Sequence, residues 1–318
     1  MSAEPATRVL TAGAQASEDG ARVLAAGGLV AFPTETVYGL GADASNGRAI
    51  ARLYAAKGRP QFNPLIAHVL DLAAASGLAT FNRAAQRLAE KFWPGPLTLV
   101  LQKSADCPVA DLATAGLDTI ALRVPAHPVA RELLAKFGKP IVAPSANRSG
   151  HVSPTTAAHV LGDLRGRIDL IVDGGATPVG LESTIVSCVN APTLLRPGAL
   201  PRETIEATLE ASLADGAPGD KPAAPGMLAS HYAPRAKLRL NASGAQAGET
   251  LLGLGPAADA ALNLSRSGDL VEAAANLFSH LRALDAKGAK VIAVMPIPRE
   301  GLGEAINDRL ERAAAPRS

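Results

Sequence analysis

The chain has 318 residues, of which 47% are hydrophobic and 19% charged, an ordinary globular composition with room for two domains. Its formal net charge of +2 is too small for a general nucleic-acid binder, whose domains usually carry a pronounced basic face. Aromatic residues make up only 3%, which disfavours a base-stacking platform for single-stranded nucleic acid.

The cysteines and the N-terminal segment bear on the compartment. Neither Cys107 nor Cys188 has a neighbour that would complete a metal knuckle or a disulfide framework. Residues 1–15 lack the basic start and apolar block of a signal peptide, and no apolar run approaches membrane-spanning length. We therefore expect reduced thiols and a cytoplasmic protein.

Residues 28–68, GLVAFPTETVYGLGADASNGRAIARLYAAKGRPQFNPLIAH, bring a strand, a polar loop, a helix and cations into close succession. The apolar run at 29–32 predicts a short buried strand, which Pro33 ends because proline cannot continue the ladder. The end of this strand therefore presents the hydroxyls of Thr34 and Thr36.

A helix is expected after this loop. Ser45 or Asn46 can cap its N-terminus, and Gly58 is placed to end it in the left-handed conformation. Lys57, in the last turn, could simply complement the helix C-terminus. Arg59 follows at once, and polar residues lie beyond it, so we favour an anion site. These further polar residues are Asn63 and His68.

Strand and helix patterns alternate through the next part of the chain, which predicts an α/β fold. Ser153-Pro154 has the form of a further helix start, with proline at the first helical position. The predicted strands are 65–67, 97–101, 119–124, 141–143, 168–172, 185–189 and 193–196, and the predicted helices are 17–26, 83–92 and 128–137.

The strand at 119–124 alternates, which places Thr119 and Arg123 on one face. Taken alone, Arg123 is more simply a surface salt-bridge partner than an anion clamp, because most strand arginines are solvated.

Polar residues recur where strands begin or end. Ser145 and Asn147 lie in a loop after a predicted strand, and ligands of open α/β sheets bind at such strand ends. Ser183 precedes another strand, and Arg196 ends the next. The free N–H groups after Ser153 could face an anion, although a plain capping serine explains that residue equally well.

The chain divides into three parts by composition. We assign residues 1–210 to a catalytic domain. Residues 211–236 are a proline- and glycine-rich linker, whose Met227, His231 and Tyr232 suggest that it docks on something. The rest, 237–318, is a small α/β domain in which we see no catalytic cluster. Its predicted strands are 238–240, 251–254, 261–264 and 291–294, and its predicted helices are 270–284 and 302–314.

Several familiar chemistries are missing from the sequence. It has no Walker A sequence, no metal-ligand histidine spacing and no nucleophile elbow, and Gly39-Leu40-Gly41 lacks the third glycine of a dinucleotide fingerprint. What remains is a set of cations and hydroxyls at strand ends, which suits a polyphosphate plus a small carboxylate. The set is Lys57, Arg59, Arg123 and Arg196 with Thr34, Thr36, Ser145, Asn147 and Ser183.

Several sequence blocks follow one another along most of the chain. They are FPTETVYGLGADA (32–44), KGRP (57–60) with the following NPL and His68, WPGPLT (93–98), RVP (123–125), APSAN (143–147), ESTIV (182–186), LRPG (195–198) and PGMLASHYAP (225–234). Together they resemble the threonylcarbamoyl-AMP synthases in their longer, two-domain form. The last block distinguishes this form from the single-domain one.

The resemblance implies a twisted, open, mixed-sheet catalytic domain of the YrdC-like type and a smaller Rossmann-like α/β domain. It implies a nucleotidyltransferase that converts L-threonine, bicarbonate and ATP to threonylcarbamoyl-AMP and diphosphate, with Mg²⁺ arriving on the ATP phosphates. The product would pass to a separate transferase complex that modifies the adenosine beside the anticodon of certain tRNAs. Direct tRNA contact by this chain stays open.

The same resemblance assigns site residues. Threonine would be held by Thr34, Thr36, His68, Arg123 and Ser183. ATP would be held by Lys57, Arg59, Asn63, Thr119, Ala143 through its backbone, Ser145, Asn147, Ser153, Arg196 and Tyr232. The linker would be a lid that closes over the nucleotide through His231 and Tyr232, and no metal held by the protein itself is implied.

Two alternatives stay open. One is a double-stranded RNA or tRNA-binding module of the same fold without synthase activity, against which the modest charge and scarce aromatic residues count. The other is a relative that uses the sheet for carbamoyl transfer within a larger enzyme or has lost the threonine reaction. The intact linker block disfavours that second alternative.

Overall fold

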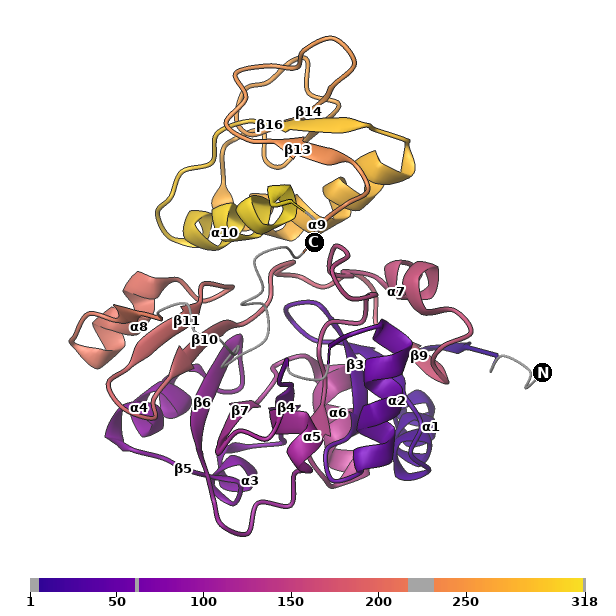
Figure 1. Cartoon of the computed structure of the whole chain (residues 1–318), viewed down its shortest axis with the longest axis vertical. Coiled ribbons are helices and arrows are strands. Elements are labelled where there is room, and N and C mark those ends of the chain that lie inside the picture. The colour runs from indigo at the N-terminus through magenta and orange to yellow at the C-terminus, as the bar shows by residue number, and fades with distance from the viewer. Residues whose placement is uncertain (1–5, 61–62, 217–231, 317–318) are drawn as a thin grey trace.

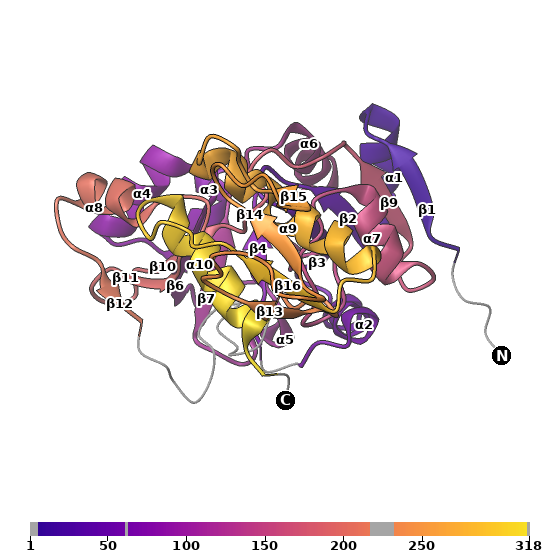
Figure 2. The same ribbon diagram turned by 90° about the horizontal axis from the view of Figure 1, so that it is seen from above.

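The structure is a computed structural model that describes residues 6–60, 63–216 and 232–316. Figure 1 shows two domains stacked on each other, with two helices of the smaller domain lying between its own sheet and the larger domain. Seen from above in Figure 2, the smaller domain lies over the middle of the larger one, not at one edge. The expected mixed α/β architecture with two domains is confirmed.

The larger domain is built on a mixed sheet whose strand order is β1-β9-β2-β3-β8-β4-β7-β6-β10-β11-β12, with β5 paired to β6. Its strands are β1 (Arg8–Thr11), β2 (Val30–Pro33), β3 (Tyr38–Asp43), β4 (Ile66–His68), β5 (Ala79–Thr80), β6 (Leu97–Lys103), β7 (Thr119–Arg123), β8 (Ile141–Val142), β9 (Leu170–Asp173), β10 (Thr184–Ser187), β11 (Thr193–Arg196) and β12 (Ala214–Asp215).

Helices cover the two faces of this sheet unequally. Buried residues of α2, α4, α7 and α8 form the main core on one face, together with α3 and α5. On the other face α1 and α6 cover one half of the sheet. The helices are α1 (Ala14–Ala25), α2 (Gly47–Lys57), α3 (Leu72–Ser76), α4 (Arg83–Phe92), α5 (Asp111–Thr114), α6 (Pro128–Phe137), α7 (Ala157–Leu164) and α8 (Arg202–Leu209).

The remaining part of that second face carries a small apolar cluster made by the central strands. Ile66 of β4, Val100 of β6, Ala121 of β7 and Ile185 of β10 are its buried members. Side chains alternate along a strand, so His68 and Arg123 emerge on the same face, two residues beyond Ile66 and Ala121. The polar ends of these strands therefore point to one place.

The C-terminal domain has a parallel sheet in the order β13-β16-β14-β15. Its strands are β13 (Lys237–Arg239), β14 (Thr250–Gly253), β15 (Leu262–Asn263) and β16 (Val291–Val294), and its helices are α9 (Leu270–Ala286) and α10 (Leu302–Ala314). All of these were expected from the sequence, with ends that differ by no more than a few residues.

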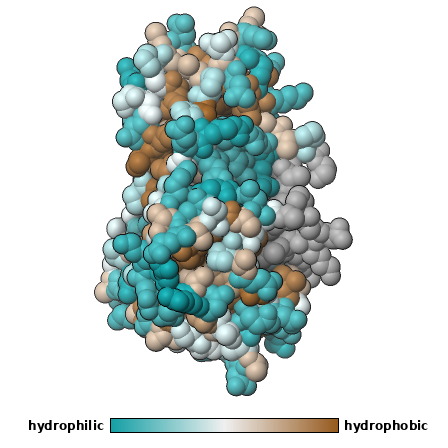
Figure 3. All heavy atoms as spheres, turned by 90° about the vertical axis from the view of Figure 1, so that its left-hand side faces the viewer, coloured by the Kyte–Doolittle hydropathy of each residue, from teal (hydrophilic) through white to brown (hydrophobic). Residues whose placement is uncertain are grey.

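The two domains share one apolar cluster. Val37, Val152 and Leu181 of the first domain are buried together with residues of α9 and α10. Gly180 touches α9 so closely that a Cβ built on it would lie 2.6 Å from the carbonyl oxygen of Ala274. On the face seen in Figure 3, hydrophilic residues spread across the junction of the domains.

The capping residues in the sequence predicted both ends of α2 accurately. Asn46, not Ser45, caps α2, because its side chain accepts from the N–H groups of Arg48 and Ala49. Gly58 ends that helix with φ of 61°, in the left-handed region where glycine is unstrained. Both capping signals act within one turn of the chain, so tertiary packing does not override them.

The expected helix start at Ser153-Pro154 is wrong. α7 begins at Ala157, and Thr156 caps it by accepting from the N–H of His159. The hydroxyl of Ser153 does not cap α7 and donates to the carboxylate of Glu182 instead. A contact between distant segments has therefore replaced the local cap.

Strand β3 was not predicted, and two of its residues are glycines. A Cβ on Gly41 would lie 2.8 Å from the ring of Phe32 on β2 and 3.0 Å from Ile141 on β8. The glycines thus allow neighbouring strands to carry large side chains, although glycine weakens the sequence signal for a strand. The sheet of the first domain also extends to β12 at 214–215, and 217–231 of the linker lie outside the described residues.

Two further observations concern the cysteines and the helices. Cys107 and Cys188 are free thiols, and burial raises the pKa of Cys188 to about 12. Among the helices formed by residues 6–60, 63–216 and 232–316, none combines the length and apolar character required to cross a bilayer.

Candidate functional site

A pocket lies where the central strands of the first domain end beneath the C-terminal domain. Its empty volume is about 520 Å³, including the part open to solvent. The lining residues are Thr34, Thr36, Val37, Gly39, Arg59, Ile66, His68, Arg123, Ala143, Pro144, Ser145, Glu182, Ser183, Arg196 and Tyr232. Ten of the residues predicted for the site are in this set.

Arg123 forms one charged side of the pocket, and strand register puts His68 beside it. Parallel pairing of β4 with β7 places His68 directly opposite Arg123. The Nη2 of Arg123 donates to Glu35 Oε1 at 2.6 Å, and its Nε donates to the carbonyl oxygen of Gly95 at 3.3 Å. The third nitrogen, Nη1, makes no hydrogen bond to any described residue, so it can still donate to a ligand.

Glu35 was not predicted as part of the site, yet it holds Arg123 in place. Its second oxygen accepts from the backbone N–H of Ala126 at 3.0 Å. Burial opposes ionisation of this carboxyl, but the charge of Arg123 outweighs that effect and the pKa of Glu35 lies below its ordinary value. The pair is therefore ionic, and the orientation of Arg123 is fixed before a ligand arrives.

His68 is a neutral imidazole at the bottom of this side. Burial, assisted by the charge of Arg123, lowers the pKa of His68 to about 3. Its Nδ1 is buried and has no hydrogen-bond partner among the residues that the structure describes. An unpaired buried polar atom costs about 1–3 kcal/mol, so the ring is poised to bond to a ligand or a water.

The hydroxyls beside Arg123 are arranged by a tight loop. Thr34 Oγ1 donates to the carbonyl oxygen of Val37 at 2.7 Å and lies 2.7 Å from Thr36 Oγ1. On the other side of the pocket, Ser183 Oγ lies 2.7 Å from Thr98 Oγ1. Thr34 Oγ1 also accepts from the backbone N–H groups of Thr36 and Val37, at 3.2 and 3.3 Å, so the loop fixes the position of this hydroxyl.

Arg59 and Arg196 form a second cationic side. Arg196 Nη2 donates to the carbonyl oxygen of Ser183 at 2.8 Å, and Arg59 Nη2 donates to that of Pro64 at 3.1 Å. Burial, and to a lesser degree repulsion by Arg196, lowers the pKa of Arg59 to about 10. Two buried guanidinium groups that repel each other are a favourable environment for an anion.

Glu182 is a pocket residue that sequence reasoning missed as part of the site. Its carboxylate is 6% exposed, accepts from Ser153 Oγ and pairs with Arg309 of α10 at 2.8 Å. The signal for Glu182 was present, since it begins the ESTIV block. Arg309 has no comparable signal, because the C-terminal helix that carries it has an ordinary charged pattern.

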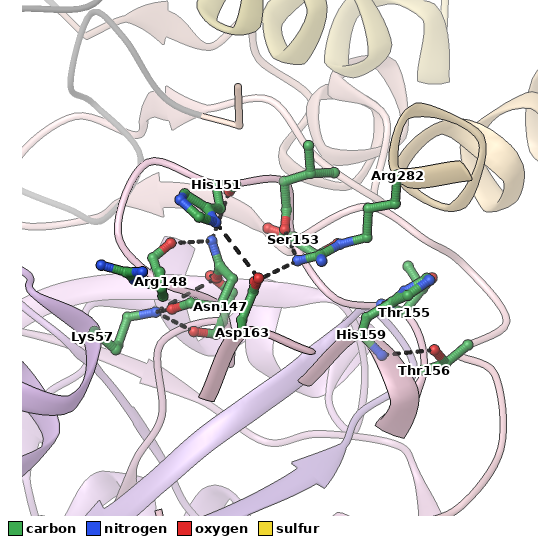
Figure 4. A network of polar contacts seen from close by, with 12 residues as sticks. Lys57, Asn147, Arg148, His151, Ser153, Thr155, Thr156, His159, Asp163 and Arg282 are labelled. Atoms are coloured by element: carbon green, nitrogen blue, oxygen red, sulfur yellow. Dashed lines mark hydrogen bonds and ion pairs between the residues drawn. The ribbon is translucent and has the colours of Figure 1, made fainter. Parts of the chain in front are cut away.

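Lys57 lies behind the pocket wall. Its ammonium donates to the carbonyl oxygens of Ser145, at 2.5 Å, and Asn147 (Figure 4). Burial and the nearby charge of Arg59 lower the pKa of Lys57 well below its ordinary value. Lys57 therefore shapes the loop that contributes Ser145 to the pocket, and its assignment as a direct ATP ligand stays a prediction.

Four other predicted residues also lie outside the described pocket wall. Thr119 is at the opposite end of β7 from Arg123, although the two share a face as expected. Asn147 bonds to backbone oxygens of its own loop, and Ser153 to Glu182. Asn63 is buried, with both amide atoms unpartnered among the described residues. None of these positions tests their assignment to ATP.

Of the two residues assigned to the proposed lid, the structure describes one, Tyr232. Tyr232 lines the pocket and is 2% exposed, with its ring stacked on Phe278 of α9 at a centroid distance of 5.7 Å. His231 lies outside the described residues. Within the described ranges, no three His, Cys, Asp or Glu side chains gather in a way that could hold a metal ion.

Comparison with known protein families gives two matches that together cover most of the chain. The family described as "Telomere recombination" (Sua5_yciO_yrdC) matches residues 22–198. The family described as "Threonylcarbamoyl-AMP synthase, C-terminal domain" matches residues 200–315. The two matches therefore correspond in order to the pocket-bearing domain and the domain that covers it.

Similar curated proteins and solved structures extend over nearly the whole chain. Threonylcarbamoyl-AMP synthase of Bacillus subtilis is 42% identical over 91% of this chain and 90% of its own length. That of Pyrococcus abyssi is 43% identical over 91% of both chains. A crystal structure of P. abyssi Sua5 complexed with L-threonine superposes with a TM-score of 0.89 at 39% identity, covering 97% of each chain. The structure of E. coli YciO, at 22% identity and a TM-score of 0.54 over 61% of this chain, shares the fold of the first domain.

Proposed function

The chain belongs to the threonylcarbamoyl-AMP synthase family, and we propose that its pocket joins L-threonine, bicarbonate and ATP into threonylcarbamoyl-AMP with release of diphosphate. The protein is a threonylcarbamoyl-AMP synthase, which acts in the first step of tRNA threonylcarbamoyladenosine formation. We class it as a nucleotidyltransferase because the adenylyl group of ATP moves to a carbamate oxygen.

The observation that carries the threonine assignment is the side of the pocket built on Arg123. Arg123 keeps Nη1 for an incoming carboxylate while Glu35 fixes its orientation. The neutral ring of His68, with its unpaired Nδ1, lies next to it. Thr34, Thr36 and Ser183 supply small hydroxyls for the amino acid. The similar P. abyssi structure is complexed with L-threonine, which supports threonine as a ligand.

The nucleotide is assigned to the second cationic side. Arg59 and Arg196 stabilise the triphosphate, and Tyr232 covers the nucleotide from the linker. Ser145 and the backbone of Ala143 contribute from the loop that Lys57 holds. Four more residues are assigned to ATP by family resemblance: Asn63, Thr119, Asn147 and Ser153.

The chemistry requires positioning and charge neutralisation more than a protein nucleophile. Bicarbonate loses hydroxide to give CO₂, and the threonine amine adds to that CO₂ to form a carbamate. The proton that the amine gives up combines with the hydroxide as water. A carbamate oxygen then attacks the α-phosphorus of ATP, and diphosphate leaves with the electron pair of the broken P–O bond. Arg59 and Arg196 stabilise the charge on the phosphates while the reacting atoms approach.

Mg²⁺ is proposed to enter on the phosphates of ATP, as is usual for transfer from nucleoside triphosphates. Glu182 is a poor ligand for such an ion because both of its oxygens already have partners, Ser153 and Arg309. The metal therefore belongs to the substrate in this proposal, and no step depends on a cation held by the protein.

The product is proposed to pass to a separate tRNA threonylcarbamoyl transferase complex. A module that binds double-stranded RNA without synthase activity is the weaker alternative. The pocket is lined mostly by buried side chains, which suits small molecules better than a duplex, whose recognition is dominated by exposed phosphate contacts.

The test is release of diphosphate from ATP by the purified protein in the presence of Mg²⁺. We expect release only when threonine and bicarbonate are both present, and we expect the threonylcarbamoyl-AMP product to appear in equal amount. The variant Arg59→Ala should lose most of the activity while it keeps its fold. Diphosphate release that ignores threonine would refute the proposal.

A further inference from the structure

A buried arginine of the C-terminal domain reaches the wall of the pocket. Arg309 lies on α10 and is 1% exposed. Its Nε donates to Glu182 Oε2 at 2.8 Å, and its Nη2 donates to the carbonyl oxygen of Pro197 at 3.0 Å. Its Nη1 pairs with Asp308 on the same helix. All three nitrogens of the guanidinium group are therefore engaged, and two of them contact the first domain.

The same guanidinium group also supports the residue that covers the pocket from above. Its central carbon lies 4.9 Å from the ring centroid of Tyr232, in a cation–π contact. Tyr232 also stacks on Phe278 of α9. Arg309 thus touches both a wall residue, Glu182, and a covering residue, Tyr232, without lining the pocket itself.

The negative charge of Glu182 is unfavourable for binding a triphosphate, and Arg309 neutralises it. A buried carboxylate beside a triphosphate would repel it, and Glu182 is also close enough to Arg196 to feel its charge. Burial opposes ionisation, but Arg309 and then Arg196 outweigh it and the pKa of Glu182 lies below its ordinary value. Arg196, one of the two arginines on the side assigned to ATP, is the other cation that acts on Glu182, so without Arg309 the carboxylate would rely on Arg196.

We propose that Arg309 is a positioning residue that the C-terminal domain contributes to the synthase site: it serves as the counter-ion of Glu182, so that the charge of Arg196 remains available to the phosphates of ATP. The inference rests on the proposed ATP site and goes beyond it, because it gives the second domain a direct electrostatic part in nucleotide binding.

The test uses the full-length protein and the dissociation constant of ATP. Arg309→Met keeps the side-chain volume and removes the charge. We expect it to weaken ATP binding by tenfold or more, about 1.4 kcal/mol or above, because the carboxylate is left to compete for Arg196. Arg309→Lys keeps the charge but loses the planar guanidinium group, so ATP affinity should fall less than in Arg309→Met.

The decisive variant is the double substitution Arg309→Met with Glu182→Gln. It removes the uncompensated carboxylate, so ATP affinity should recover most of what Arg309→Met alone loses. A role limited to holding the domains together predicts that ATP affinity changes only in step with the unfolding free energy, which Glu182→Gln also raises by removing the unpaired buried carboxylate. Urea unfolding of the single and double variants is therefore measured in parallel, and ATP affinity should change more than stability accounts for. Comparable weakness in the single and double variants would therefore overturn the inference, as would unchanged affinity in Arg309→Met.

Arg202→Met is the matched control. Arg202 also links the first domain to α10, through Glu304 at 2.7 Å, but it lies outside the pocket wall. Its loss should leave ATP affinity within about threefold of the wild-type value, as expected for a partly exposed ion pair. If Arg309→Met does not fold, Arg309→Lys and the double variant still give the comparison.

The wild-type protein separates this inference from the proposed function. If the wild type neither binds ATP nor releases diphosphate with threonine and bicarbonate, the proposed function fails. If the wild type does both and Arg309→Met matches it, the proposed function stands and the role of Arg309 is refuted. Threonine affinity, measured in the same variants, should change less than ATP affinity.

Discussion

Two buried arginine–glutamate pairs flank the pocket, and they are oriented in opposite ways. In the pair of Arg123 with Glu35, the arginine lines the pocket and the glutamate lies behind it. In the pair of Arg309 with Glu182, the glutamate lines the pocket and the arginine lies behind it. The first pair presents a cation to a ligand, whereas the second removes the charge of an anion that would repel one.

The pairs also differ in the parts of the chain that form them. Glu35 and Arg123 both belong to the first domain, which can therefore assemble the threonine side alone. Arg309 comes from the C-terminal domain and crosses the interface to reach Glu182. Under the proposed assignment of ligands, the second domain therefore contributes to the ATP side of the pocket and has little effect on the threonine side.

The largest effect is expected from Arg123→Met. Breaking a buried pair by removing one partner costs about 3–5 kcal/mol of folding stability, because Glu35 is left charged and unpaired. Threonine affinity should fall by about a hundredfold or more with the loss of the carboxylate clamp. Calorimetric threonine binding and urea unfolding measure the two effects.

The control for that variant adds Glu35→Gln to Arg123→Met. Removing the unpaired carboxylate should restore much of the stability, while threonine binding stays weak. Recovery of threonine affinity in the double variant would contradict the assignment of Arg123 as the group that binds the carboxylate.

The next effect concerns the interface that carries the second pair. Gly180→Ala places a Cβ 2.6 Å from the carbonyl oxygen of Ala274 in α9, at a φ of 75° that already strains alanine. We expect a loss of about 3 kcal/mol in unfolding free energy, from strain plus overpacking, together with weaker ATP binding.

Gly175→Ala is the matched control for this prediction. Gly175 has a similar φ of 83°, but its added Cβ meets nothing within 4 Å. Strain alone should cost about 1–2 kcal/mol and leave ATP affinity unchanged. Equal effects of the two substitutions on ATP affinity would refute the claim that docking of the C-terminal domain supports ATP binding.

A pH-dependent effect comes from His68. The unfolded chain binds a proton on this histidine below about pH 6.5, whereas the folded protein binds it only below about pH 3. The unfolded state therefore holds more protons in this window, and stability falls as the pH drops from about 6.5 toward 3. His68→Gln should flatten the dependence of unfolding free energy on pH by up to about 1.4 kcal/mol per pH unit.

His159 provides the comparison for that variant, since burial lowers its pKa to about 4 outside the described pocket wall. His159→Gln should flatten the same pH dependence without weakening threonine binding. His68→Gln should weaken it. A loss of threonine affinity in both variants would indicate that the His68 effect reflects general destabilisation.

The smallest effect is expected from Arg202→Met, which breaks a partly exposed link between the domains. Its side chain is 21% exposed, and that of Glu304 is 29% exposed. Such pairs contribute about 0–1 kcal/mol, so thermal unfolding should change little. A loss of stability as large as that of Gly180→Ala would show that the Arg202–Glu304 ion pair, and not close packing at Gly180, holds the domains together.

The sequence predicted what local signals control. Asn46 and Gly58 bound α2 as expected, and the alternation in β7 correctly placed Thr119 and Arg123 on one face. Strand ends were sufficient to bring Arg123 and Arg196 to one pocket, because neighbouring strands of one sheet end together, whereas Arg59 enters from the loop after α2.

What the sequence could not predict depends on contacts between distant segments. Ser153 left its expected cap to bond with Glu182, and Lys57 turned inward to hold a loop some ninety residues away. Arg309 is separated from Glu182 by 127 positions and carries no motif. No local rule identifies such partners, since the docking of two complete domains creates the contact.

The most direct test of the account is calorimetric binding of threonine and of ATP to the wild type, Arg123→Met and Arg309→Met. The account predicts opposite preferences: Arg123→Met weakens threonine more than ATP, and Arg309→Met weakens ATP more than threonine. Equal weakening of both ligands by both variants would contradict it.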